Sequence, residues 1–216
     1  MTIQEMHQTF RVFAQQMGMQ LVRAILPEEI DVYLNSAIIE KVREVVFTNT
    51  NTVFNDRISI QDNSISPINY IRTLYKQKEL SLTDKTNKRF YIEENNDIMF
   101  YTYISLVYKD DDVVYGARLI EPDKLHSTLR DFCNGASFDY PIVSIYNIDG
   151  QEVIKTFTGK KEIEQIIINY ISNPIKVSYK ENINCDLPEY THNDIVQLAC
   201  QKYFVSVGST THNVNN

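Results

Sequence analysis

Hydrophobic positions in the first part of the chain recur with the period of an α-helix. A capping box from Thr2 to Glu5 is followed by apolar residues at steps of three or four, namely Met6, Phe10, Phe13, Met17 and Leu21. A second helix is predicted from Pro27, because proline suits a first helical turn and apolar residues keep the helical period up to Val46. The two helices are expected to form a hairpin, residues 1–47.

The pattern then changes from helix to strand. Asn and Thr are frequent in residues 48–64, which favours turns and leaves at most a short strand at 57–60. Short helices are predicted from Pro67 and from Pro122, the second with an inward face formed by Leu125, Leu129 and Phe132. Alternating and β-branched runs predict strands over 89–92, 98–108, 113–120, 140–147, 152–157 and 175–179.

Two later segments complete the predicted fold. Residues 160–172 fit either a strand or a helix, and their stiff isoleucine run favours a strand at the distal end. An amphipathic helix enters through Leu187-Pro188-Glu189 and is expected to pack on the sheet. The sequence thus predicts an α+β fold with a mixed or antiparallel sheet of about five to seven strands. Its parts are the helical hairpin (1–47), the α+β body (48–207) and a flexible tail (208–216).

Composition narrows the function without fixing it. The chain has 14 Tyr, 10 Phe and no Trp, and tyrosine is common both in strands and at protein interfaces. A net charge of -7 argues against a surface that clamps nucleic-acid phosphates. The three cysteines are far apart and odd in number, which favours a reducing compartment. Neither a secretory signal nor an apolar run of about 18 residues is present, so we expect no membrane partner.

Candidate catalytic residues are few. Cys185 and His192 lie seven residues apart across a helix start, where a pairing of nucleophile and base is conceivable, although Asp186 opposes thiolate formation. The triple aspartate from Asp110 lacks the glycine of a calcium loop, because Tyr115 stands at the sixth position. No phosphate-binding loop, zinc-protease or nucleophile-elbow motif occurs. We therefore expect no catalytic residue, no metal and no cofactor.

The order of four segments resembles a known family of virion proteins. These segments are Glu29-Ile30-Asp31-x-Tyr33-Leu34-Asn35-x-Ala37, Tyr140-Pro141-Ile142-Val143 with Tyr146, Tyr170-Ile171-x-Asn173-Pro174-x-Lys176-Val177, and Cys185-Asp186-Leu187-Pro188-Glu189-x-x-His192-x-Asp194-Ile195-Val196-x-Leu198-Ala199. They resemble the ring, or head-to-tail connector, proteins next to the portal in crAss-like tailed bacteriophages. The resemblance covers most of the chain, and residues 48–115 are its least distinctive part.

The resemblance implies a structural protein made in the host bacterial cytoplasm and located in the virion. Its partners would be identical copies in a ring of about twelve subunits, the portal protein, adjacent connector or tail rings, and DNA passing through the lumen. Candidate interface residues are Met6, Phe10, Phe13, Met17, Tyr101, Tyr103 and Tyr203. The alternatives are another tail or baseplate component, or a small intracellular hydrolase that uses Cys185 and His192.

Overall fold

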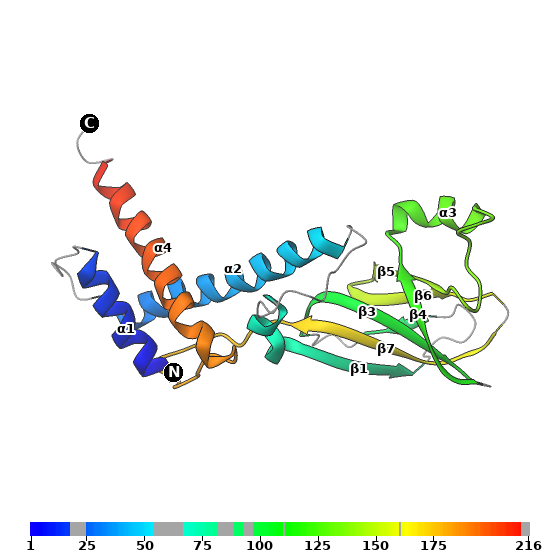
Figure 1. Cartoon of the computed structure of the whole chain (residues 1–216), viewed down its shortest axis with the longest axis horizontal. Coiled ribbons are helices and arrows are strands. Elements are labelled where there is room, and N and C mark those ends of the chain that lie inside the picture. Colours follow the sequence, from blue (N-terminus) through cyan, green and yellow to red (C-terminus); the bar gives the residue numbers. More distant parts are fainter. Residues whose placement is uncertain are drawn as a thin grey trace. The chain divides into compact units, whose positions relative to one another are not determined.

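The chain forms two compact units (Figure 1). The computed structural model describes residues 1–17, 25–53, 67–81, 89–92, 97–109, 111–159 and 161–212, without the side chains of 48–53, 67–68, 111–112 and 208–212. A helical unit combines Met1–Leu74 with Pro174–Asn216, and a sheet unit comprises Tyr75–Asn173. This division differs from the expected boundaries at residues 47 and 207, because the C-terminal segment returns to the N-terminal helices.

The described part of the helical unit contains three α-helices and two short 3-10 helices. They are α1 (Ile3–Gln16), α2 (Pro27–Val53), η1 (Pro67–Leu74), η2 (Glu189–Thr191) and α4 (His192–His212). The predicted capping box is confirmed, since the Glu5 N–H donates to Thr2 Oγ1 and the Thr2 N–H donates to Glu5 Oε2. Helix α2 continues into the segment predicted as turns, and the strand expected at 57–60 lies outside the described residues.

Helix α4 packs against α1 and α2, and Figure 1 shows it beside α1 and crossing α2. Tyr203 joins all three helices, because its ring meets Phe10 at 5.8 Å and Tyr33 at 5.3 Å, both edge to face. The most buried side chains of this core are Ile3, Met6, Phe10, Ala14, Ile30, Leu34, Ala37, Ile38, Val42, Ile195, Val196, Ala199 and Cys200. The C-terminal helix was expected to pack on the sheet, but its apolar stripe is buried among helices. It also extends to His212, into the tail expected to be flexible.

Seven strands form one sheet in the order β1-β7-β3-β4-β5-β6-β2. The strands are β1 (Tyr75–Ser81), β2 (Arg89–Tyr91), β3 (Ile98–Tyr108), β4 (Asp111–Leu119), β5 (Ile142–Ile148), β6 (Gln151–Phe157) and β7 (Ile163–Ser172). All neighbours are antiparallel except β4 and β5, whose parallel pairing requires the crossover that contains α3 (Pro122–Arg130). The ambiguous segment is therefore strand β7, whereas β1 was not predicted.

The sheet is curled, and its edge strands β1 and β2 approach each other. One face therefore encloses its own core, built from Leu80, Phe90, Ile92, Ile104, Leu106, Tyr108, Val143, Ile154, Ile163, Ile166, Ile168 and Tyr170. The hairpin of β5 and β6 turns at Asp149 and Gly150, which both have positive φ. The α+β class is confirmed.

Helix α3 is shorter than its apolar pattern indicated. It ends at Arg130, and of the three residues expected to face inward only Leu125 is buried. The Phe132 side chain lies beyond the helix and is fully exposed, at 102%. The helical period of the apolar residues continues in the sequence to Phe132, but the helix itself ends at Arg130 and the backbone then turns toward β5.

Replacing Phe10 by alanine tests the core of the helical unit. Because the ring is completely buried, we expect Phe10→Ala to lower the free energy of unfolding by about 3–5 kcal/mol. The matched control is Val12→Ala, on an exposed side chain of the same helix, with a change within about 0.5 kcal/mol. Chemical denaturation followed by circular dichroism measures both, and equal effects would contradict this packing.

Candidate functional site

Two polar side chains of α2 hold the chain after the sheet unit. The Asn35 amide accepts from the Val177 N–H at 2.9 Å and donates to the Val177 carbonyl at 3.0 Å. One helical turn earlier, Asp31 Oδ2 accepts from the Tyr179 N–H at 2.9 Å. These side chains pair with alternate residues of an extended segment, as a neighbouring strand does. The strand predicted at 175–179 is therefore wrong, because its backbone is paired by a helix.

His7 of α1 also contacts Asp31. Its Nε2 is 2.8 Å from Asp31 Oδ1, and its ring is 4.7 Å from the ring of Tyr179. The histidine is almost completely buried, and its Nδ1 has no hydrogen-bond partner among the described residues. Asp31 thus connects α1, α2 and the returning segment, which is a structural role.

Polar residues just before α4 add to this contact. Asp186, from the segment before α4, accepts from the Ile175 N–H at 3.2 Å, and Asn184 accepts from the Ile3 N–H at 2.8 Å. With Asp31 and Asn35, they fasten three distant stretches of sequence to one another. The polar residues of these stretches therefore form a framework for the fold.

Cys185 and His192 do not form an activated pair. The His192 Nε2 donates to the Leu187 carbonyl at 2.9 Å, and no hydrogen bond between His192 and Cys185 occurs among the described residues. Burial raises the pKa of Cys185 to about 11, and the Asp186 carboxylate acts in the same direction. A nucleophilic cysteine requires the opposite shift, so this site is poorly suited to covalent catalysis.

Neither a metal centre nor a cofactor site is indicated by the described side chains. Among them, no group of three or more His, Cys, Asp or Glu residues is arranged to hold a metal ion. Asp110 and the side chains of Asp111 and Asp112 lie outside the described part of the chain. The aspartate turn therefore stays a prediction.

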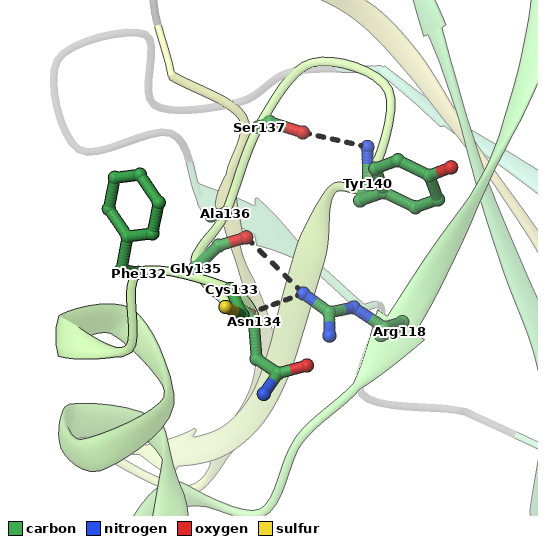
Figure 2. A pocket seen from close by; sticks show the side chains of 8 residues that line it. All are labelled: Arg118, Phe132, Cys133, Asn134, Gly135, Ala136, Ser137 and Tyr140. Atoms are coloured by element: carbon green, nitrogen blue, oxygen red, sulfur yellow. Dashed lines mark hydrogen bonds between the residues drawn. The ribbon is translucent and has the colours of Figure 1, made fainter.

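A cleft of about 480 Å³ lies between β4 and the segment that joins α3 to β5 (Figure 2). Arg118 of β4 reaches into this segment, where its Nη2 donates to the carbonyls of Asn134 at 2.6 Å and Gly135 at 3.4 Å. Its buried Nε has no hydrogen-bond partner among the described residues. Arg118 therefore brings a positive charge to the wall of the cleft and also fixes its shape.

Aromatic rings stand at the sides of this cleft. Figure 2 shows Phe132 and Tyr140 on opposite sides of the segment that Arg118 holds. Tyr140 is 68% exposed, and Leu119 at the end of β4 is 50% exposed. The described lining residues include neither histidine nor a carboxylate, so the cleft suits binding better than acid–base chemistry. Sequence reasoning missed it, because Phe132 was assigned to a helix core.

The candidate interface residues of the helical unit are mostly internal. Met6 and Phe10 are fully buried, and Phe13 is partly buried. Tyr203 is also partly buried, in contact with Phe10 and Tyr33. The sulfur of Met17 lies 3.8 Å from the thiol of Cys200, and Cys200 is buried in the core. Met6 and Phe10 therefore stabilise the unit itself, whereas Met17 is 37% exposed.

The two candidate tyrosines of the sheet unit behave differently. Tyr101 is partly buried and donates to Glu152 at 2.9 Å, and burial together with that carboxylate raises the pKa of the phenol. Tyr103 is 53% exposed and lies over Gly116, where a Cβ would meet its hydroxyl. Of the pair, Tyr103 is the more accessible to a partner.

Comparison with known proteins leaves the family open. No protein-family model matches the chain, and no curated protein sequence matches it. Among the described residues, no helix is both long enough and apolar enough to cross a membrane.

Removing the Asn35 amide tests the link between α2 and the returning segment. We expect Asn35→Ala to lower the free energy of unfolding by about 1–3 kcal/mol, because Val177 loses both of its partners. The adjacent Ser36→Ala removes only an exposed contact with Lys202, so about 0.5 kcal/mol or less is expected. Thermal unfolding of both variants checks this difference.

Alkylation of the cysteines tests the environment of Cys185. With a pKa of about 11, its thiolate fraction at pH 8 is about one in a thousand, so iodoacetamide should react slowly. The rate should rise about tenfold per pH unit between pH 8 and 10. Exposed Cys133 is the internal control and should react first. Mass spectrometry of tryptic peptides gives both rates, and fast modification of Cys185 at pH 7 would revive the hydrolase alternative.

Proposed function

We propose that this chain is a structural subunit of a tailed-phage virion that forms a ring in the head-to-tail connector. The observation that carries the proposal is the exposure of large apolar side chains on both units. Phe132 is 102% exposed in the sheet unit, and Val205 is 68% exposed in the helical unit. Neighbouring exposed apolar side chains mark surfaces that another protein covers, and in the sheet unit Phe132 and the 68% exposed Tyr140 line one cleft.

The framework of the helical unit supports a structural role. The residues through which the sequence resembles connector proteins include Asp31, Asn35 and Asp186. Asp31 and Asn35 bind backbone of a distant segment, and Asp186 binds the Ile175 N–H within the returning segment. Such residues preserve a fold. The high pKa of Cys185 likewise disfavours the hydrolase alternative.

Charge supports the proposed location beside DNA. The chain carries 28 acidic and 21 basic residues, which gives a net charge of -7. Binding to DNA depends on basic side chains that displace counterions from the phosphates. An acidic surface in the lumen of a ring would instead allow DNA to pass without adhering.

Assembly of the purified protein tests the proposal. We expect light scattering to show a mass well above the 25.2 kDa of one chain, and negative-stain images to show closed rings of about twelve copies. Addition of the cognate portal protein should increase the ring population, because stacked rings share contacts. A protein that stays monomeric alone, and does not bind the portal either, would contradict a connector role.

A further inference from the structure

We propose that the Arg118 cleft, which lies between β4 and the segment joining α3 to β5, binds a short peptide segment of a partner protein. In this segment one carboxylate stands beside an apolar side chain. The carboxylate pairs with the Arg118 guanidinium, and the apolar side chain packs on Phe132 or Tyr140. The inference goes beyond the connector role and does not depend on it, because it concerns the chemistry of a single cleft within the sheet unit.

Arg118 retains unused hydrogen-bond donors. Its Nη2 donates to the carbonyls of Asn134 at 2.6 Å and Gly135 at 3.4 Å, and both dashed lines from the guanidinium in Figure 2 start at this nitrogen. The Arg118 side chain is partly exposed, and its Nη1 makes no hydrogen bond with any described residue. A guanidinium stays charged at every relevant pH and has five N–H donors, so Arg118 can still bind a carboxylate.

The positive charge of Arg118 has no opposite charge in the cleft. Arg118 is the only charged residue among the described lining residues, and it forms no ion pair with a described carboxylate. Asp131 lies outside the lining, and its oxygens accept from the N–H groups of Cys133 and Asn134 and from the Asn134 amide. These hydrogen bonds lower the pKa of Asp131 and hold its carboxylate in the loop. A ligand carboxylate therefore supplies the missing negative charge.

A single guanidinium favours one carboxylate over a polyanion. Nucleic acids and other polyphosphates are bound by several Lys or Arg side chains, and the described lining contributes one. The chain as a whole carries -7, which repels a strongly acidic ligand. One isolated carboxylate is repelled weakly, because exposed charges more than about 8 Å apart are largely screened at physiological ionic strength. The partner segment therefore carries its carboxylate among uncharged residues.

The wall of the cleft is held in place before any ligand binds. Tyr108 of β3 donates to the Phe138 carbonyl at 2.9 Å, and Lys161 Nζ lies 4.5 Å from the centre of the Phe138 ring. The Tyr140 N–H donates to Ser137 Oγ at 3.1 Å, and the Ser137 N–H donates to the Tyr140 carbonyl at 3.3 Å. A segment fixed in this way loses little conformational freedom on binding, which favours affinity.

The aromatic side chains of the cleft favour a peptide over a small free carboxylate. Phe132 and Tyr140 line the same cleft as Arg118 and are 102% and 68% exposed. Arginine and aromatic residues are enriched where proteins bind each other. A small carboxylate would pair with Arg118 and leave both rings uncovered. A peptide segment also brings an apolar side chain to cover them.

Matched peptides test the chemistry of the ligand. The probes are synthetic peptides of about ten residues with capped ends, one Glu and one Leu, in a panel that varies the spacing between the two. Each has a twin with Gln in place of Glu. Fluorescence anisotropy should show that the best Glu peptide binds at least about tenfold more tightly than its twin, because a charge-assisted hydrogen bond is lost in the twin. N-acetylglutamate, the small free carboxylate, should compete only weakly.

Variants of the full chain test the place of binding. Arg118→Gln should weaken binding of the Glu peptide about tenfold or more and remove the preference over the Gln twin. Phe132→Ala should weaken both peptides at least about threefold. The matched controls are Arg130→Gln, with the same loss of charge at the exposed end of α3, and Val114→Ala, at a 55% exposed position of β4. Neither residue lines the cleft, so both controls should bind like wild type.

Folding of the variants is checked by circular dichroism and thermal unfolding. Arg118 also holds the backbone of the loop, so Arg118→Gln can lower stability. Phe132 is fully exposed, and its replacement should leave the melting temperature unchanged. Phe132→Ala therefore tests the cleft even where the arginine variant does not fold.

Four results would overturn the inference. The first is equal binding of Glu and Gln peptides, and the second is no binding of any Glu peptide at about 1 mM. The third is binding of N-acetylglutamate as tight as that of the best peptide, which would assign the cleft to a small carboxylate. The fourth is self-association that is lost in Arg118→Gln and kept in Arg130→Gln, which would assign it to a second copy of the chain. The connector role is decided separately, by the mass and the images of the wild-type protein.

Discussion

The fold depends on a contact between a helix and a stretch of backbone 142 residues away. Asn35 binds both polar groups of Val177, and Asp31 binds the N–H of Tyr179 while it also contacts His7. Polar backbone groups that leave water need such partners. Because α2 supplies them, the chain returns from the sheet unit to the N-terminal helices, and α4 begins where α1 and α2 can bury its apolar stripe.

The sheet unit buries its apolar side chains in a different way from the helical unit. A sheet with one apolar face usually needs a second layer. Here the sheet curls, so that the apolar side chains of one face pack against one another in a single core. Ile166 and Ile168 of β7 lie in that core. The crossover between β4 and β5 consequently lies outside it, with Arg118 holding its backbone. Its aromatic residues face solvent, which makes this connection suited to contacts with other molecules.

Several residues singled out from the sequence lie in other surroundings than their pattern suggested. Cys185 and His192 first suggested chemistry. The His192 side chain donates to the Leu187 carbonyl instead, and burial raises the pKa of Cys185, which lowers its reactivity. Apolar residues that first suggested an interface, Met6 and Phe10, are core. The accessible apolar surface lies instead at the end of α4 and around the cleft.

The sequence by itself determined the capping box at Thr2, most of the strands and the helical period of α1, α2 and α4, because these follow from local patterns of side chains. It also determined the acidic charge. Only the tertiary structure decided that Val177 and Tyr179 bind Asn35 and Asp31 rather than a neighbouring strand, since extended backbone accepts any suitable partner. It likewise decided which apolar residues stay exposed. Phe10 and Phe132 have the same side chain, and only the neighbours that folding brings to each one distinguish core from surface.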